Sequence, residues 1–226
     1  MTTAQLKKWQ TFLATFPKKS FRKGDILLFQ GEAPRFAFVV SRGIVKAYNI
    51  NNQGDEQLVQ FNTALEALPL SWVYGKSANA LYYYEALTDG GYYCVDREDL
   101  LNFMRHDADI MFGELERMVI NYVGETMSFN ALLYSKASEK LINTLRYLIL
   151  SHGYRHDGVI EIRLKLTQQD FANLTGLTRE TVSIELMKLK KLGVISYNKH
   201  TNYTVNIDNM NALINEQFVA EVSMQV

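Results

Sequence analysis

The strongest constraint on this chain lies between Leu166 and Val194, where two segments with helical periodicity flank a single glycine, Gly176. The first segment follows Thr167, a residue type that caps helix N-termini, and Asp170 three positions later completes an approximate capping box. A glycine at the end of such a helix permits the left-handed backbone conformation that a sharp turn requires. The pattern therefore predicts two short helices joined by a tight turn.

The second helix is expected to begin after Thr178, which is again a favourable N-cap residue. Its apolar residues recur at helical spacing, at Val182, Leu186 and Leu189. A short helix, a glycine turn and a capped second helix are typical of the helix-turn-helix motif, whose second helix contacts base edges in the major groove. An ordinary helical hairpin with a charged surface would give the same bare pattern.

Residues 178–183, with the sequence TRETVS, resemble the start of the recognition helix in the Crp/Fnr family of bacterial transcription regulators. The resemblance extends from about Lys18 to Ile207 and is most specific in the C-terminal third. It implies that Arg179 and Glu180 read bases. Arg can pair with guanine through two hydrogen bonds, and Glu can accept a hydrogen bond from the cytosine amino group.

One position departs from the family pattern. The family usually has a second arginine three residues after Thr181, where this chain has Ile184. The contact of that arginine is then missing, or it is replaced by apolar contact with a thymine methyl group. Ser183 is a further candidate for base contact. Five polar residues are expected to contact the DNA backbone, namely Thr167, Gln169, Thr178, Thr181 and Lys199.

Charge is distributed unevenly, although the chain of 226 residues is formally neutral. Residues 136–207 carry eleven Lys and Arg against six Asp and Glu, whereas the segments before and after are net acidic. A basic segment beside an acidic one fits a DNA-binding domain joined to a second domain. We therefore expect domains at residues 1–106 and 136–226, connected by a long helix and hinge at residues 107–135.

Several classes of protein are excluded by what the sequence contains. The single cysteine, Cys94, rules out a disulfide framework and a four-cysteine iron–sulfur cluster, suits a reducing cytoplasm and is interpreted as a packing residue. No signal-peptide pattern is present, and Arg146 interrupts the most apolar helix, so no membrane partner is expected. No nucleophile elbow, His/Glu metal spacing or phosphate loop occurs, so we expect no catalytic residues and no metal site.

The N-terminal half is expected to contain short strands separated by glycine turns, after a short amphipathic helix at residues 4–16. The expected strands are Ile26–Gln30, Phe36–Ser41, Ile44–Ile50 and Glu56–Phe61, with another at Tyr82–Leu87. The order of the turns, Lys-Gly-Asp, Gln-Gly-Glu, Arg-Gly and Gly-Asp-Glu, resembles the β-roll of cyclic-nucleotide-binding domains in Crp/Fnr regulators. The fold class is then α+β, with an antiparallel β-roll, a long dimerisation helix and a winged helix-turn-helix.

Nucleotide-binding members of the family hold the ribose with a Gly-Glu pair and the cyclic phosphate with an Arg-Ser pair. In this chain Ala80 and Leu81 fall at the Arg-Ser positions, and no Gly-Glu precedes them. A cyclic phosphate requires a cation and backbone donors, so neither cyclic AMP nor cyclic GMP is expected as a cofactor. Aromatic residues gather here instead and either pack the roll or line a pocket for a planar ligand. The candidate ligand-binding residues are Glu66, Trp72, Tyr83 and Tyr84.

Residues 107–133 are predicted to form one long helix. Seven residues recur on it at alternating spacings of four and three, Met111, Leu115, Met118, Tyr122, Glu125, Phe129 and Leu132, a heptad seam broken once at Glu125. One small β-domain cannot bury a seam of this length, and the family resemblance implies a twofold coiled coil. The alternative is a helix packed wholly within the monomer. Gly124 would allow close approach of another element or slight bending.

The remaining elements expected in the C-terminal segment surround the helix-turn-helix. They are a helix at Lys140–His152, a strand at Val159–Lys165, a two-stranded wing at Ile195–Tyr197 and Tyr203–Val205, and a last helix from Asp208 to about Val219. A turn at Asp157-Gly158 lies in the loop between the first helix and the strand.

These features predict a homodimeric regulator whose two recognition helices enter successive major grooves of an inverted repeat in double-stranded DNA. An activator would also contact RNA polymerase, and the sequence marks no surface for that contact. An effector bound in the β-roll would act only by favouring the DNA-competent arrangement, and a regulator competent without one fits equally well. The competing class is a ligand-sensing or protein-interaction module that does not act through DNA.

Overall fold

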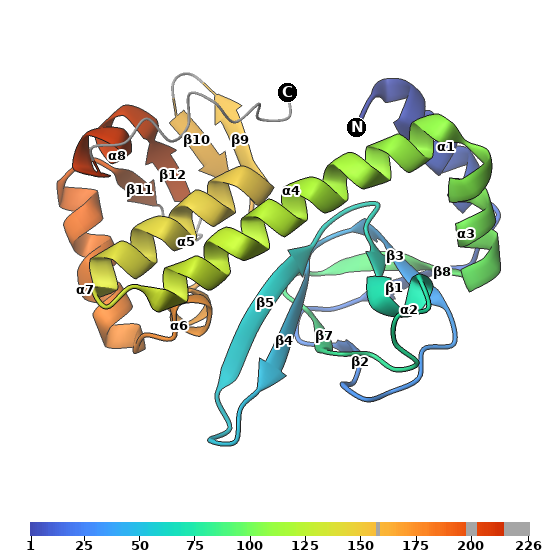
Figure 1. Cartoon of the computed structure of the whole chain (residues 1–226), viewed down its shortest axis with the longest axis horizontal. Coiled ribbons are helices and arrows are strands. Elements are labelled where there is room, and N and C mark those ends of the chain that lie inside the picture. The colour runs from blue at the N-terminus through green and yellow to red at the C-terminus, as the bar shows by residue number, and fades with distance from the viewer. Residues whose placement is uncertain (157–158, 198–202, 215–226) are drawn as a thin grey trace. The chain divides into compact units, whose positions relative to one another are not determined.

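The computed structural model describes residues 1–156, 159–197 and 203–214. The chain forms two compact units, Met1–Met118 and Val119–Val226 (Figure 1). The boundary between them falls within the long helix α4 (Ala108–Leu133). The three-part division at residues 106 and 135 stays a prediction.

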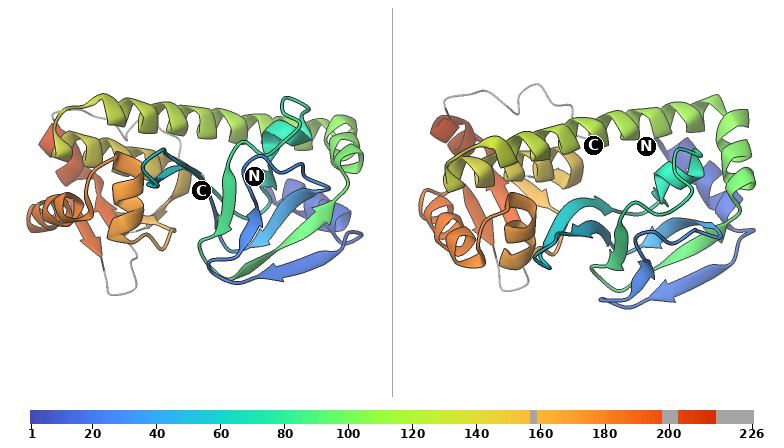
Figure 2. Two further views of the ribbon diagram at one scale, coloured as in Figure 1. Left: turned by 90° about the horizontal axis from the view of Figure 1, so that it is seen from below. Right: turned by 60° about the horizontal axis from the view of Figure 1, so that its bottom comes forward.

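The N-terminal unit is a roll of two four-stranded sheets, and each of its strand pairs is antiparallel. The first sheet has the order β1 (Lys18–Phe21), β8 (Gly90–Val95), β3 (Ala37–Arg42) and β6 (Ala67–Leu68). The second has the order β2 (Ile26–Leu28), β7 (Tyr83–Ala86), β4 (Val45–Ile50) and β5 (Glu56–Asn62). Figure 2 shows β4 and β5 side by side as one long hairpin. This arrangement confirms the predicted antiparallel β-roll.

Two apolar clusters hold the roll together. One lies within the sheets and includes Leu28, Val40 and Tyr84, each at most 3% exposed. The other joins the first sheet to α1 (Thr3–Leu13) and α3 (Arg97–His106). In that cluster Phe12 stacks on Phe103 with ring centroids 4.1 Å apart. The predicted N-terminal amphipathic helix therefore packs aromatic side chains on α3.

Several elements of the roll, among them β8 and α2, are not among those expected. The central strand β8 begins with two glycines and lacks an alternating apolar pattern, and its Cys94 is buried, as expected of a packing residue. The short helix α2 (Leu70–Val73) follows Pro69 and has only four residues. Both segments are too short or too irregular for hydrophobic periodicity to identify them.

The long helix α4 was predicted within one residue of its observed limits. It begins after Asp107, whose carboxylate accepts hydrogen bonds from the backbone amides of Asp109 and Ile110. Lys8 of α1 donates to the Asp107 and Asp109 carboxylates at 2.8 and 2.9 Å. Helix α1 is thus bound to the first turn of α4 within the N-terminal unit.

The C-terminal unit combines helices with a four-stranded antiparallel sheet of order β11, β12, β10, β9. Its elements are α5 (Ala137–His152), β9 (Gly153–His156), β10 (Val159–Ile162), α6 (Gln168–Thr175), α7 (Arg179–Lys191), β11 (Ile195–Tyr197), β12 (Tyr203–Asn206) and α8 (Ile207–Ile214). Helix α5 contacts α6, α7 and β10 through buried leucines, among them Leu141, Leu145 and Leu148. This is the predicted winged helix-turn-helix architecture.

Strand β9 was expected to be loop. It pairs with β10 from Gly153 opposite Ile162 to His156 opposite Val159, which adds a strand to the sheet. A glycine followed by polar residues carries no strand signal of its own, so the pairing comes from the partner strand. The predicted last helix is described as far as residue 214, and its remainder lies outside the described residues.

Candidate nucleic-acid interface

The first helix of the motif, α6, is fixed at its start by a complete capping box. The Asp170 amide donates to Thr167 Oγ1 at 3.2 Å, and the Thr167 amide donates to Asp170 Oδ2 at 2.7 Å. The Thr167 hydroxyl also donates to Asp170 Oδ2 at 2.7 Å. The hydroxyl of Thr167, a predicted backbone-contact residue, is therefore engaged within the protein in the absence of DNA.

The turn between the two helices has the predicted geometry. Gly176 follows α6 with φ 63° and ψ 25°, the left-handed conformation that glycine adopts without steric strain. Thr178 then caps α7, and its Oγ1 accepts a hydrogen bond from the Thr181 amide at 3.2 Å. The two threonine hydroxyl oxygens lie 2.9 Å apart. The start of the second helix is therefore held by local contacts that were readable from the sequence.

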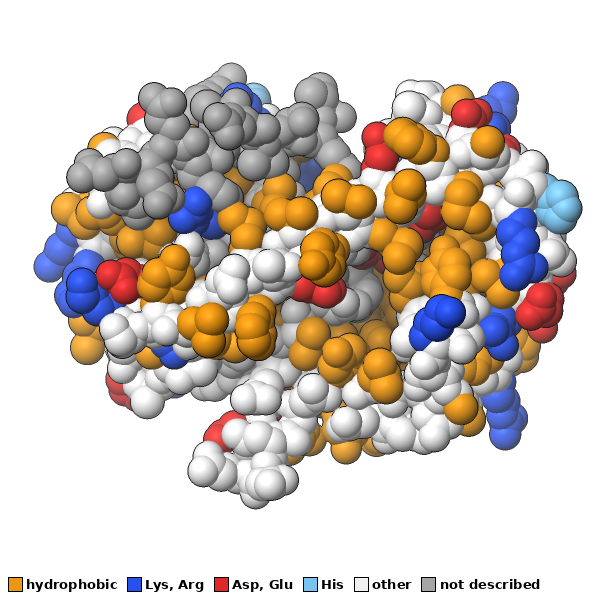
Figure 3. Space-filling model, viewed as in Figure 1, with side chains coloured by type: hydrophobic (Ala, Val, Ile, Leu, Met, Phe, Trp, Pro, Cys, Tyr) orange, Lys and Arg blue, Asp and Glu red, His pale blue; other side chains and the backbone are white. Residues whose placement is uncertain are grey.

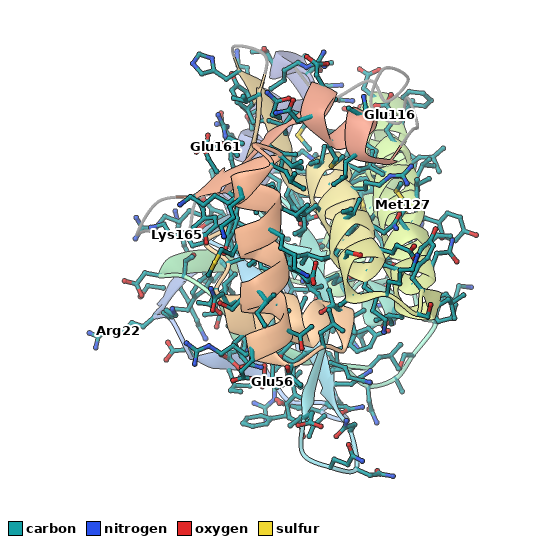
Figure 4. The ribbon with its side chains drawn as sticks, turned by 90° about the vertical axis from the view of Figure 1, so that its left-hand side faces the viewer. Arg22, Glu56, Glu116, Met127, Glu161 and Lys165 are labelled. Carbon is teal, nitrogen blue, oxygen red and sulfur yellow. The ribbon has the colours of Figure 1, made fainter. Side chains whose placement is uncertain are left out.

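Helix α7 has one buried side and one exposed side. Val182, Leu186 and Leu189 are buried, as expected. Arg179 and Glu180 are exposed at the start of the helix, where the free backbone amides and the helix dipole favour an anion. Figure 4 faces this helix, which is drawn in orange.

The other predicted contact residues surround the start of α7. Thr178 is exposed, and Thr181 and Ser183 are partly buried. Gln169 is exposed on α6, and its amide donates to Asn173 Oδ1 at 2.7 Å. Lys199 lies outside the described residues, in the predicted wing between β11 and β12. The roles of all these residues in DNA contact stay predictions.

Basic residues gather at the far end of α7, where cations complement the helix dipole. Lys188 Nζ lies 2.7 Å from Glu185 Oε1, and Lys190 Nζ lies 4.3 Å from the centre of the Tyr197 ring. Lys191 is exposed. No group of three or more His, Cys, Asp or Glu that could hold a metal ion occurs in the described part of the chain.

One exposed apolar pair on α7 was only half anticipated. Ile184 is 54% exposed and Met187 is 50% exposed, and both follow Glu180 at helical spacing. Ile184 departs from the family pattern, whereas Met187 was not among the predicted contact residues. Its position three residues after Ile184 was the signal that could have identified it.

The four candidate ligand-binding residues do not converge on one site. Tyr83 and Tyr84 are adjacent on β7 and therefore point to opposite faces of the sheet. Tyr84 lies in the core, where burial raises the pKa of its hydroxyl, and Tyr83 stacks on Tyr48 with ring centroids 5.3 Å apart. Trp72 lies beside Arg97, whose guanidinium carbon is 5.7 Å from the ring centre.

Glu66, the last candidate, is used to hold a turn. Its Oε2 accepts hydrogen bonds from the backbone amide and the hydroxyl of Thr63. Nearby, Arg117 of α4 donates to the Leu65 carbonyl at 2.8 Å and pairs with the buried Glu114. Burial is the largest influence on Glu114 and raises the pKa of its carboxyl. The segment that precedes β6 is thus bound to α4 through Arg117.

Helix α4 exposes the whole predicted seam. All seven seam residues are exposed in the single chain, from Met111 at 37% to Tyr122 at 71%. A neighbouring face, about 100° around the helix from the seam, is buried at Ile110, Glu114, Gly124 and Ala131, again at spacings of four and three or their sums. Figure 3 shows the hydrophobic side chains that follow the helix on the solvent side.

Among the helices of the described residues, none has an apolar stretch that could span a membrane.

Comparison with known proteins places both units. The family model for the cyclic nucleotide-binding domain matches residues 18–107, and that for the Crp-like helix-turn-helix domain matches residues 139–216. The chain belongs to the Crp/Fnr family. It is therefore a DNA-binding transcription regulator with a helix-turn-helix domain, and not an enzyme.

Individual relatives agree with this assignment. Electron transport regulator A of Shewanella oneidensis is 27% identical over 179 residues, which cover 79% of this chain and 70% of that protein. The HTH-type transcriptional regulator ArcR of Staphylococcus epidermidis is 27% identical over 192 residues, which cover 84% of this chain and 82% of the relative. FixK2 from Bradyrhizobium japonicum has the same fold, with a TM-score of 0.70 at 18% identity over 94% of this chain and 99% of the other.

Proposed function

We propose that this Crp/Fnr regulator acts in the cytoplasm as a homodimer that binds an inverted-repeat DNA site through α7. The observation that carries the proposal is the start of α7, where Thr178 caps the helix and Arg179 and Glu180 are exposed. In helix-turn-helix proteins this end of the second helix enters the major groove. In a twofold dimer, two such helices would bind half-sites about one helical turn apart.

Arg179 and Glu180 are assigned to base reading, with Ser183 as a further contact. A guanidinium can bind guanine through two hydrogen bonds, and a carboxylate can accept one from cytosine. Thr178 and Thr181 are assigned to a phosphate near the start of the helix, where backbone amides are free to donate. Thr167, Gln169 and Lys199 complete the proposed backbone contacts.

Dimerisation is assigned to the exposed seam of α4. The seam residues are mostly large and apolar, and each of them is accessible to a second copy of the chain. Two such helices packed about a twofold axis would remove these side chains from water, which is the main source of coiled-coil stability. A helix that served only its own β-roll would have no need of apolar residues on this side.

Cyclic nucleotides are not assigned as effectors. Ala80, at the position that resembles the family's phosphate-binding pair, is 2% exposed and offers only a methyl side chain. Its amide donates to the Glu32 carbonyl at 2.8 Å, so this donor is also in use. Titration calorimetry with cyclic AMP should give no heat of binding. A micromolar dissociation constant would show that the phosphate-binding residues lie elsewhere. Another effector and a contact with RNA polymerase both stay open.

The function is tested by changing one base-reading side chain. Arg179→Ala should abolish discrimination between selected and scrambled duplexes in a competition assay, while sedimentation still gives a dimer. Lys191→Ala is the matched control, because Lys191 is an exposed cation at the other end of the same helix. It should leave selectivity intact. Retained selectivity in Arg179→Ala would refute the base-reading role, and failure of the unaltered protein to bind any duplex would favour a protein-interaction module.

A further inference from the structure

We infer that Ile184 and Met187 form an apolar reading surface on α7 that recognises thymine methyl groups in each half-site. The inference rests on the proposed function, since it requires α7 to lie in the major groove. It replaces the family's second recognition arginine with a different kind of contact. The expected half-site therefore carries thymines at the positions beyond those read by Arg179 and Glu180.

The two side chains lie on the same exposed face as Glu180. The intervals from Glu180 to Ile184 and from Ile184 to Met187 are four and three residues, which places all three in one row along the helix. Ile184 and Met187 are each about half exposed, although large apolar side chains on this helix are otherwise buried between residues 182 and 189. The row runs from the start of α7 toward its middle.

The length of this row matches several base pairs. A helix rises about 1.5 Å per residue, so Glu180 and Met187 are separated by roughly 10 Å along the axis. Base pairs are spaced about 3.4 Å apart, so the row spans about three steps. A helix that presents Glu180 to one base pair therefore presents Ile184 and Met187 to the pairs that follow.

The chemistry of the two side chains selects one base feature. The isoleucine side chain has no hydrogen-bonding group, and the methionine thioether is only a weak acceptor. The apolar group that a base presents in the major groove is the C5-methyl group of thymine. No basic residue occurs between Arg179 and Lys188, so this part of the helix carries no cation to bind guanine. Burial of exposed Ile184 and Met187 against methyl groups removes apolar surface from water.

Deoxyuridine substitution tests the inference directly, because uracil lacks only the methyl group of thymine. The purified protein is first used to select a duplex from random DNA, and each thymine of the half-site is then replaced by deoxyuridine. At one or two thymines the affinity should fall about fourfold for a change in one half-site and about fifteenfold for both, the value of one buried methyl-sized group per half-site. Thymines elsewhere in the duplex should be insensitive.

Three variants at the two positions test which side chain makes each contact. Ile184→Ala should bind the thymine duplex more weakly and lose the sensitivity to deoxyuridine at its own thymine, while Met187→Ala should do the same at a neighbouring one. Ile184→Arg should shift the preference at that position toward guanine. Both positions are exposed, so circular dichroism should show unchanged folding.

The outcomes separate this inference from the proposed function. Selective binding without deoxyuridine sensitivity at any half-site thymine would overturn the methyl contact and leave the DNA-binding role standing. Sensitivity that persists in both alanine variants would assign the methyl contact to other residues and overturn the inference as well. Absence of selective DNA binding by the unaltered protein would overturn both.

Discussion

The turn of the helix-turn-helix offers a quantitative test, because Gly176 has a positive φ of 63° in open surroundings. A Cβ built at this position would meet only Leu132 Cδ2, at 4.0 Å, which is an ordinary van der Waals contact. The cost of Gly176→Ala is therefore conformational and not steric. Left-handed backbone costs a non-glycine residue about 1–2 kcal/mol, and the lower entropy of the unfolded alanine chain returns about 0.4–1 kcal/mol. The net loss of stability should be about 1 kcal/mol.

Urea unfolding followed by circular dichroism measures this loss. With a slope of roughly 2 kcal/mol per molar urea, the midpoint of Gly176→Ala should fall by about 0.5 M at unchanged slope. Gly176→Asn is the matched variant, since asparagine tolerates the left-handed conformation better than alanine, and its midpoint should fall less. An alanine variant as stable as the unaltered protein, or an asparagine variant less stable than the alanine one, would refute the reasoning.

Three further predictions follow from the helices of the C-terminal unit and the seam. Gly124→Ala should lower stability by about 1 kcal/mol in thermal or urea unfolding, although alanine has the better helix propensity, because its Cβ would clash with Ser151 Oγ and lie 3.0 Å from the Tyr147 ring. An increase in stability would show that α5 moves to accommodate the added Cβ. Glu125→Leu should tighten the dimer roughly tenfold or more in sedimentation equilibrium, because in a twofold seam each Glu125 lies beside the Glu125 of the second copy. Glu116→Leu, which lies away from the seam, should leave the dimer affinity unchanged, and an equal effect of both variants would contradict dimerisation through the seam. Burial lowers the pKa of His152 to about 4, below its ordinary value near 6.5, so the unfolded chain binds a proton first and stability should fall as pH drops from about 6.5 toward 4. A His152→Asn variant should show a shallower pH dependence of stability, and an equally steep one would assign the effect to other groups.

Local signals explain why the helix-turn-helix was predictable. Thr167, Gly176 and Thr178 act on their own neighbours through caps and a turn, and these interactions depend on sequence separations of three or four residues. The seam of α4 was predictable for a similar reason, since a heptad repeat defines a helix face without reference to the rest of the fold. The structure confirms the helix and shows that the seam residues are exposed to solvent in the single chain, while the dimer itself stays a prediction.

The β-roll was less predictable because its contacts join residues distant in sequence. Three consecutive tyrosines precede Glu85, and the sequence does not tell which of them faces the core; the structure places Tyr84 there. Lys46 is an example that the sequence did not signal at all. It is only 7% exposed, and its Nζ lies 2.8 Å from Glu56 and 3.3 Å from Glu85, residues of two other strands. Such an ion cluster depends on strand order, which local periodicity does not contain.

The positions of the candidate ligand residues also depend on contacts between distant parts of the chain. Trp72, Tyr83 and Tyr84 were proposed as aromatic pocket residues, and Glu66 as the acid nearest to the missing Gly-Glu pair. Strand pleating directs the two tyrosines to opposite faces of the sheet, and the Glu66 carboxylate holds a turn. Arg117 of α4 donates a hydrogen bond to the Leu65 carbonyl across a separation of 52 residues, which no local sequence pattern indicates. The response of the roll to any effector would have to involve such long-range contacts.

The central claim is that this protein reads DNA as a twofold dimer through α7, and selection of bound sequences from a random duplex library tests it most directly. With the purified 226-residue chain, the selected sites should contain an inverted repeat whose half-site centres are about one helical turn, roughly 10 base pairs, apart. Enrichment of a single asymmetric half-site would contradict the dimer, and absence of any enrichment would contradict sequence-specific reading by α7.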